Sequence, residues 1–414
     1  MIQIAIMGHG VVGSGVVEVL LRNADEVAHK AGRPIGIKRI LDLRSFPDSP
    51  LCDRFTTNFE DIATDPEIRV VVETMGGLHP AYEFVKRCLE NGKSVVTSNK
   101  ELVAAKGDEL LAIARENNLN FLFEASVGGG IPILRPLDQC LAANKVTEIA
   151  GILNGTTNFM LTKMINEGFS FEDALALAQQ LGYAERDPSA DIHGHDACRK
   201  ICILASLAFG HHVLPEEVLT EGIAAVTGDD VSAAAALGGV VRLIGRAKKY
   251  DNGRLHIQVA PMLVEKSCLL SHVDDVFNAV LVRGNAVGDT VFYGRGAGKL
   301  PTASAVVADV IDAVKHLSAR KFLYWEPAQK DQVCPADEEP YAWMLRLPAS
   351  AHAQALEALP VTESAAGDKL PAGQTVLRTA PLTKPALDAA LEKAGVSPLS
   401  CLRVFPAQQE KSEE

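Results

Sequence analysis

Residues 2–13 read IQIAIMGHGVVG, and this stretch decides the fold of the chain. Its first part, Ile2–Met7, is mostly apolar and predicts a buried strand. Glycines at 8, 10 and 13 have the spacing G-x-G-x-x-G, and a helical pattern, Ser14–Arg22, follows them directly. This order is typical of dinucleotide-binding domains, because glycine lets the backbone approach a pyrophosphate at the helix N-terminus. The residues expected to contact a cofactor are Gly8, Gly10, Val11, Val12 and Gly13.

Strand–helix alternation continues to about residue 134. The further candidate strands are Ile37–Asp42, Val70–Glu73, Ser94–Thr97 and Asn120–Glu124, and the helical stretches include Pro80–Asn91 and Glu101–Asn117. Alternation at this spacing predicts a parallel sheet with helices on both faces. The predicted fold class is therefore α/β, with a Rossmann-type domain over residues 1–134.

The pattern changes in the rest of the chain. Residues 135–325 predict an α+β domain with strands Val146–Leu153, His256–Val264, Asn278–Val282 and Asp289–Tyr293 and helices Phe171–Leu181, Asp196–Phe209 and Ala303–Leu317. Residues 340–408 predict a small ferredoxin-like unit with one strand missing or blurred, from strands Tyr341–Leu347, Thr375–Thr379 and Leu402–Phe405 and helices Ala351–Leu359 and Lys384–Ala394. The charged residues 409–414 predict a disordered tail.

Composition excludes several classes of protein. A length of 414 residues predicts two or three domains, and a net charge of -12 argues against a nucleic-acid or anionic membrane surface. The sequence holds no apolar run long enough for a membrane span, and its N-terminus reads straight into a strand instead of a leader. Eight scattered cysteines favour a reduced, cytoplasmic protein.

The end of the second strand bears on the choice of cofactor. Asp42 is placed to bond a ribose hydroxyl, whereas Arg44 is placed to hold a 2′-phosphate. Either residue is also compatible with a solvated loop charge. The prediction leans to NADP, or to use of both cofactors.

Lys100 follows the fourth large strand in the order Thr97-Ser98-Asn99-Lys100. Ligands of open parallel sheets collect beside the carboxyl ends of the strands, so Lys100 is a candidate contact for the nicotinamide, a cofactor phosphate or a substrate carboxylate. The alternative is a helix N-terminal residue with Asn99 as the cap.

Three consecutive glycines follow Glu124 in the stretch Glu124–Pro132, EASVGGGIP. Such a turn exposes backbone groups to a bound ion or to a cofactor, and a carboxylate with several carbonyls suits a hard cation. A tight crossing between domains explains the same stretch equally well.

An acidic segment precedes an apolar helix at Asp196 and Lys200. These two residues lie four apart on one helix face, and burial would shift the lysine pKa downward into the range useful for acid–base chemistry. An ordinary ion pair is the plainer interpretation. A third alternative makes His193 and His195 metal ligands together with Asp191 and Asp196.

Taken together, these segments resemble homoserine dehydrogenase. The matching pieces run in the family's order over about residues 1–320 and are GHGVVGSGV at 8–16, TSNKELVA at 97–104, EASVGGGIP at 124–132, GILNGTTNFML at 151–161, GYAERDPSADIHGHDACRK at 182–200 and GRGAGKLPTASAVVAD at 294–309. The NGTTNF motif, followed by GYAExDP and DxxGxDxxxK, is far more specific than the glycine fingerprint. The resemblance implies NAD(P)-dependent, reversible interconversion of aspartate 4-semialdehyde and homoserine.

The resemblance also implies roles for particular residues. Lys200 would exchange the hydroxyl proton with help from Lys100, and Glu185 and Asp196 would hold homoserine. The pocket would be lined by Asp191, Asn154, Gly155, Thr156 and Thr157, and further cofactor contacts would come from Thr74, Ser98, Lys100, Gly182 and Gly298. Glu124, with the carbonyls of Val127, Gly129 and Ile131, matches the family's structural site for a monovalent cation, usually sodium. The second domain would then be catalytic and dimerising, in a homodimer or homotetramer without a nucleic-acid or membrane partner.

The C-terminal unit departs from the family pattern. Many members end in an ACT domain with a glycine-containing ligand turn, whereas Leu347–Ala353 contains no glycine. A degenerate ACT-like domain that does not sense threonine is therefore expected. The competing hypotheses are a phosphorylating semialdehyde dehydrogenase, for which no cysteine is suitably placed, and a non-catalytic NAD(P)-binding regulator, against which Lys200, Glu185 and Asp196 argue.

Overall fold

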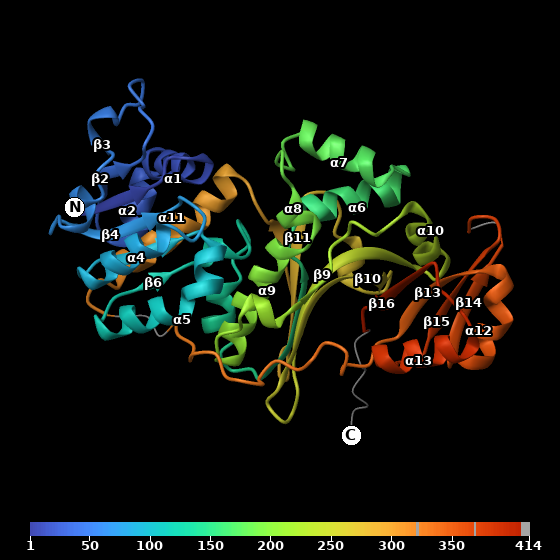
Figure 1. Cartoon of the computed structure of the whole chain (residues 1–414). Coiled ribbons are helices and arrows are strands. Elements are labelled where there is room, and N and C mark those ends of the chain that lie inside the picture. The colour runs from blue at the N-terminus through green and yellow to red at the C-terminus, as the bar shows by residue number, and fades with distance from the viewer. Residues whose placement is uncertain (320–322, 368–369, 407–414) are drawn as a thin grey trace. The chain divides into compact units, whose positions relative to one another are not determined.

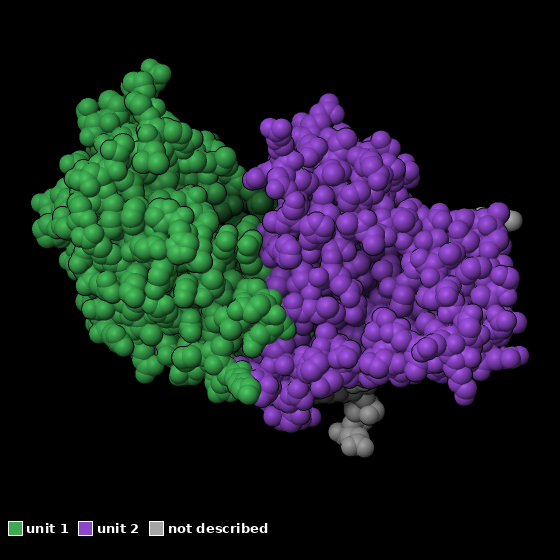
Figure 2. Space-filling model, viewed as in Figure 1, with its two compact units in different colours: residues 1–149, 199–217, 282–330 green, residues 150–198, 218–281, 331–414 purple. Residues whose placement is uncertain are grey.

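The computed structural model describes residues 1–319, 323–367 and 370–406. The chain forms two compact units, drawn in green and purple in Figure 2. Unit 1 comprises residues 1–149, 199–217 and 282–330, and unit 2 comprises residues 150–198, 218–281 and 331–414. Both units are assembled from separate segments, so they do not follow the contiguous boundaries 1–134, 135–325 and 340–408. The tail predicted at 409–414 lies outside the described residues.

Unit 1 is built on a six-stranded parallel sheet with the order β3-β2-β1-β4-β5-β6. The strands are β1 (Ile2–Met7), β2 (Ile35–Leu41), β3 (Phe55–Thr56), β4 (Ile68–Glu73), β5 (Ser94–Thr97) and β6 (Phe121–Leu122). β4 and β5 are almost continuous runs of buried residues, as expected for strands covered on both faces. The strand order reverses between β1 and β4, so a ligand is expected at their carboxyl ends. The predicted α/β architecture of this part is confirmed.

Helices cover this sheet, and one of them comes from far along the sequence. The helices are α1 (Val11–Arg22), α2 (Ala24–Ala31), α3 (Glu60–Ala63), α4 (Ala81–Glu90), α5 (Lys100–Glu116) and α11 (Lys299–Lys315). α11, orange in Figure 1, lies among the blue elements because its apolar face, with Val306 and Val310, shares a buried core with Val16 of α1. At Gly15 a Cβ would lie 2.8 Å from the carbonyl oxygen of Lys299, so the close approach of α1 and α11 requires glycine there. The predicted helix Ala303–Leu317 exists, but it belongs to unit 1 instead of the expected second domain.

Unit 2 combines a helical layer with a long antiparallel pair of strands. Its helices include α6 (Gly155–Glu167), α7 (Phe171–Gln180), α8 (Ser189–Ile192) and α10 (Gly228–Ala236), and its strands include β8 (Leu219–Thr220), β9 (Gly239–Lys249) and β10 (Leu255–Glu265). Along the chain, β7 (Val146–Ile152), α9 (His195–Phe209) and β11 (Phe277–Gly284) run from one unit into the other, and β12 (Gly288–Arg295) belongs to unit 1. β9 is a strand that the sequence did not predict, because Arg242 and Arg246 interrupt its apolar pattern although both are buried.

The C-terminal segment of unit 2 is a complete βαββαβ arrangement. Its elements are β13 (Trp343–Pro348), α12 (His352–Ala358), β14 (Val361–Ala366), β15 (Gln374–Thr379), α13 (Lys384–Ala394) and β16 (Ser400–Val404), with the strand order β16-β13-β15-β14. The strand expected to be missing is β14, which is an exposed edge strand and therefore lacks an apolar signature. β16 pairs in parallel with β10, so these strands continue the sheet of β9 and β10 (Figure 1). Across the parts of the chain that the structure describes, no helix is both long and apolar enough to cross a membrane.

Candidate active site

The glycine turn after β1 has the geometry expected for holding a dinucleotide. Gly8 has φ +93°, and a Cβ at Gly13 would lie 2.0 Å from the carbonyl oxygen of Gly8, so neither position tolerates a side chain. Thr74, after β4, donates its hydroxyl to the carbonyl of Gly8 at 2.9 Å and braces the turn. Gly10 precedes α1 and offers no side chain to cap it, so the first N–H groups of the helix face whatever binds there. The residues present fit the pyrophosphate of a dinucleotide.

A pocket of about 560 Å³ opens beside this turn. It is lined by Gly8, Gly10, Leu41, Asp42, Leu43, Arg44, Thr57, Phe59, Thr74, Met75, Gly76, Pro80 and Phe84. Asp42 accepts hydrogen bonds from Arg44 Nε at 3.0 Å and Nη2 at 2.9 Å, and from the backbone N–H of His9 at 2.8 Å. The Arg44 guanidinium holds the pKa of the Asp42 carboxyl well below its usual range. Asp42 is thus engaged within the protein, whereas the Arg44 side chain is 62% exposed at the pocket.

Lys100 is the first residue of α5, and Asn99 caps this helix by accepting a hydrogen bond from Leu102 N at 3.1 Å. The capping alternative is therefore correct for Asn99, and it leaves the half-buried Lys100 beside the carboxyl end of β5. Ser98 donates its N–H to the carbonyl of Glu73 at 3.3 Å. Glu73, a fully buried carboxylate at the end of β4, was not singled out from the sequence because it reads as the last residue of an apolar strand.

The Glu124 carboxylate lies buried beneath the turn that follows it. Its Oε1 accepts hydrogen bonds from the N–H groups of Ile133 and Leu134, and its Oε2 accepts one from Arg135 N at 2.8 Å. Glu124 N in turn donates to Asp309 at 2.8 Å, and burial, followed by repulsion from Glu124, raises the pKa of Asp309 to about 7.

The glycine turn itself leaves three carbonyls available. Among the described residues, none donates a hydrogen bond to the carbonyl oxygens of Val127, Gly129 or Ile131. At Gly129, which has φ +58°, a Cβ would lie 2.3 Å from the carbonyl of Gly296, so this turn also packs closely against its own unit. The close packing is thus within unit 1 instead of between domains, and the ion site stays a prediction.

The substrate residues expected in unit 2 gather around Asn154. Asn154 caps α6 by accepting from Thr157 N at 2.8 Å, and its Nδ2 donates to Asp191 at 2.7 Å and to Asp196 at 2.9 Å. One amide therefore holds two carboxylates that lie 37 and 42 residues away in the sequence. Asp196 is buried, and Lys200, also buried, lies four residues further along α9.

Two other expected residues lie differently. Thr156 donates to the carbonyl of Tyr183 at 2.7 Å, which ties α6 to the turn between α7 and α8. Glu185, in that turn, is exposed, and its described contact is a hydrogen bond from Gln179 to its backbone carbonyl at 3.2 Å. Gly182 has φ +74° and Gly298 has φ +125°, both in turns that favour glycine.

A metal site of histidines and carboxylates is not supported. Within residues 1–319, 323–367 and 370–406, no group of three or more His, Cys, Asp or Glu side chains could hold a metal ion. The rings of His193 and His195 lie with their centroids 6.3 Å apart. Asp191 and Asp196 are instead bound by Asn154.

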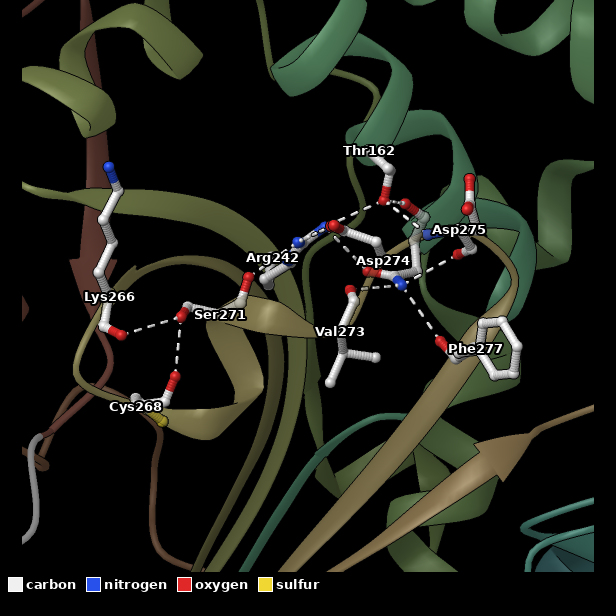
Figure 3. Close-up of polar contacts among 10 residues, drawn as sticks. Thr162, Arg242, Lys266, Cys268, Ser271, Val273, Asp274, Asp275 and Phe277 are labelled. Carbon is white, nitrogen blue, oxygen red and sulfur yellow. Dashed lines mark hydrogen bonds and ion pairs between the residues drawn. The ribbon is translucent and has the colours of Figure 1, made fainter.

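Arg242 of β9, which no sequence motif indicated, supports α6 from below (Figure 3). Its guanidinium donates to Asn158 and Thr162 of α6, each at 3.2 Å, and pairs with Asp274 at 2.6 Å. Asn158 then donates to the carbonyls of Val273, Asp275 and Phe277 at 2.9 to 3.1 Å. This network fixes the 273–277 segment against α6, where a Cβ at Gly155 would lie 2.9 Å from the Val276 carbonyl oxygen.

The predicted site residues belong to both units of the chain. Residues of the glycine turn, Thr74, Ser98, Lys100, Lys200 and Gly298 are in unit 1, whereas Asn154, Gly155, Thr156, Gly182, Glu185, Asp191 and Asp196 are in unit 2. Each half is organised within its own unit by the contacts described above.

Two protein families match successive parts of this chain. The family described as "Homoserine dehydrogenase, NAD binding domain" matches residues 8–124, and the family described as "Homoserine dehydrogenase" matches residues 132–311. A homoserine dehydrogenase of Pseudomonas aeruginosa is 45% identical over 322 residues, which are 77% of this chain and 73% of the relative.

Solved structures extend the similarity along the chain. The crystal structure of a homoserine dehydrogenase from Thiobacillus denitrificans is 37% identical and matches with a TM-score of 0.89 over 98% of both chains. A hyperthermophilic archaeal homoserine dehydrogenase in complex with NADPH is 30% identical and matches with a TM-score of 0.65 over 75% of this chain and 97% of its own.

Proposed function

This chain belongs to the homoserine dehydrogenase family, and from that premise we propose how its own residues perform the family's reaction. The reaction is the reversible, NAD(P)-dependent reduction of L-aspartate 4-semialdehyde to L-homoserine, in the biosynthesis of threonine, methionine and isoleucine. One observation supports these roles. Asn154 donates hydrogen bonds to both Asp191 and Asp196, and Asp196 lies on the same helix as Lys200.

Lys200 is the residue proposed to exchange the proton of the substrate hydroxyl, with Lys100 as the second lysine of the pocket. Asp196 and Asp191 each accept a hydrogen bond from the Asn154 amide, which fixes their orientation. These two carboxylates are the groups proposed to bind the ammonium group of homoserine, since a carboxylate pairs well with a charged donor. Glu185 is proposed as a third carboxylate, and Gly155 and Thr156, at the start of α6, are proposed as further substrate contacts.

The cofactor half is proposed to bind NADP in preference to NAD. The residues that would hold it are Gly8, Gly10, Val11, Val12, Gly13, Arg44, Thr74, Ser98, Lys100, Gly182 and Gly298. When bound, the nicotinamide supplies the hydride acceptor and donor of the reaction. The exposed Arg44 guanidinium suits a 2′-phosphate, whereas Asp42, already bonded to Arg44 and His9, is poorly placed to accept from a ribose hydroxyl.

Steady-state oxidation of homoserine with NADP and NAD in parallel tests this assignment. Wild-type enzyme should oxidise homoserine and prefer NADP. Arg44→Ala should weaken NADP binding by about 10-fold or more, since it removes a charge-assisted contact, and it should improve NAD because it releases Asp42. Arg22→Ala, an exposed arginine at the end of α1, is the control. Equal losses with both cofactors would contradict the role of Arg44, and no turnover of homoserine would contradict the function itself.

A structural monovalent cation, sodium, is proposed at Glu124 and the carbonyls of Val127, Gly129 and Ile131. The three acceptors without donors support it, as does the buried Glu124 carboxylate that precedes them. We further propose a cytoplasmic homodimer or homotetramer, and a C-terminal unit that is a degenerate ACT-like domain. The βαββαβ order of that unit supports this last proposal.

A further inference from the structure

A buried glutamate, Glu73, ends β4 and is hydrogen-bonded to Thr97 at the end of β5. We infer that Glu73 is a positioning residue for the cofactor pocket, holding Met75 and Gly76 in the pocket wall and, through Thr97, the start of α5 that carries Lys100. The inference rests on the cofactor site proposed for unit 1. Glu73 itself lies beneath that site, with its side chain completely buried.

Glu73 binds the turn that follows β4. Glu73 Oε1 accepts hydrogen bonds from Met75 N at 2.7 Å and Gly76 N at 3.2 Å. Both residues line the pocket together with Thr74, which braces the glycine turn. Gly76 and Gly77 have φ of +79° and +70°, so this stretch has wide conformational freedom of its own. The carboxylate of Glu73 selects one conformation by binding two successive N–H groups.

Thr97 and Asn99 connect Glu73 to the start of α5. Thr97 donates its hydroxyl to Glu73 Oε2, and the same hydroxyl accepts from Asn99 N at 2.9 Å. Asn99 caps α5 and donates its side-chain amide to the carbonyl of Gly77 at 2.6 Å. The hydrogen bonds therefore close a ring that joins the turn after β4 to the first residues of α5.

If packing were its only role, a buried glutamate at position 73 would be less favourable than an apolar side chain. Desolvation raises its pKa, opposed by the hydrogen bonds from Thr97, Met75 and Gly76. An apolar side chain would fill the same space without that cost, whereas it could not bind two N–H groups and a hydroxyl at once. The role of the Glu73 carboxylate is therefore to hold the pocket wall in one geometry.

Glu73→Gln tests the inference, with Glu109→Gln as the matched control. Glu109 of α5 accepts from Tyr82 and Lys86 of α4, so it links the two helices that follow β4 and β5 without contacting the pocket wall. The affinity for NADPH is measured by fluorescence titration without substrate, alongside the thermal midpoint, KM and kcat. Glu73→Gln should raise the Kd for NADPH by about 10-fold or more, while Glu109→Gln should stay within about twofold.

Thr97 provides an independent test should Glu73→Gln fail to fold. Thr97→Val removes the hydroxyl and should weaken NADPH binding, whereas Thr97→Ser keeps the hydroxyl and should retain it. Wild-type affinity in Glu73→Gln or Thr97→Val, or losses that follow the thermal midpoint equally in the Glu73 and Glu109 variants, would overturn the inference. Failure of the wild-type enzyme to bind NADPH or NADH would instead overturn the proposed cofactor site.

Discussion

Among single residues, Lys200 occupies a position that favours proton exchange. It is buried near the start of a helix whose next residues, Ile201–Ala205, are buried and mostly apolar. These surroundings shield the Lys200 side chain from bulk water, which suits the proton exchange that we propose for it. Asp196, held by Asn154, lies on the same helix face, so the environment of Lys200 is set by residues that also bind substrate in our proposal.

Lys200→Ala is expected to lower kcat by about 10²-fold or more, because it removes the group that we propose exchanges the hydroxyl proton. The affinity for NADPH should stay near wild type. Arg199→Ala is the control, since Arg199 is the neighbouring cation and is partly exposed against Glu101. Steady-state kinetics with a separate binding titration check both statements. A variant that keeps most of its kcat would remove Lys200 from the mechanism.

Glu185→Gln tests whether Glu185 contacts the substrate or only forms part of the turn between α7 and α8. The Glu185 side chain is exposed, so replacing its charge should cost little stability. If it binds the substrate ammonium, the KM for homoserine should rise by about 10-fold while the KM for NADP changes little. Initial rates with each substrate varied in turn give both constants. Unchanged constants would assign Glu185 to the turn between α7 and α8 alone.

At the scale of elements, α6 carries a polar stripe with two functions. Asn154, Asn158 and Thr162 recur every four residues and share one face of the helix. Asn154 binds the carboxylates of Asp191 and Asp196, whereas Asn158 and Thr162 accept from Arg242. The support beneath α6 therefore sets where its first turn, with Asn154, is held.

Arg242→Met should loosen that support. It leaves Asn158 and Thr162 without a charged donor, so unfolding should become easier by about 2 kcal/mol or more and the thermal midpoint should fall by roughly 4 °C. The KM for homoserine should rise, whereas the Kd for NADPH, most of whose proposed contacts belong to unit 1, should change little.

Asp274→Asn is the control for Arg242→Met, because Asp274 is half exposed and its loss leaves the contacts of Arg242 with α6 intact. Its effects on the thermal midpoint and on KM should be clearly smaller. Equal shifts in homoserine KM and NADPH affinity for Arg242→Met would mean that Arg242 serves general stability.

At the scale of the whole molecule, the C-terminal unit is integrated into unit 2. β16 pairs with β10, and Arg346 binds Asp230 at 3.0 Å while Arg403 binds Glu221 at 2.6 Å. Residues 347–353, all of which the structure describes, run from the end of β13 into α12 without a positive φ. These features suit a unit used in packing more than one that opens around an effector.

Threonine is therefore expected not to regulate the enzyme. A ligand turn at Leu347–Ala353 would need backbone N–H groups free to reach a carboxylate, and Pro348 lacks one while no glycine permits the turn. Activity titrated with threonine into the millimolar range should stay flat. Cooperative inhibition that disappears on substitution of Ser350 or His352 would show that this segment senses threonine.

Features that depend on residues close together in the chain could be predicted without a structure. The glycine turn at residues 8–13, the Asn99 cap and the helix that carries Asp196 and Lys200 are local patterns, so their spacing predicts them directly. Most strands of the parallel sheet were predicted for the same reason. The family motifs then supplied the expected roles.

Tertiary structure alone decided which distant segments meet. α11 belongs to unit 1, and β9 contains two buried arginines, Arg242 and Arg246. Thr97 bonds to Glu73, 24 residues away, and Arg242 bonds to Asn158, 84 residues away. Such contacts leave no periodic signature, because a buried polar residue is chosen for a partner that local spacing does not reveal. The residues proposed for the site could thus be named from the sequence, whereas the residues that hold them in place are found only in the folded structure.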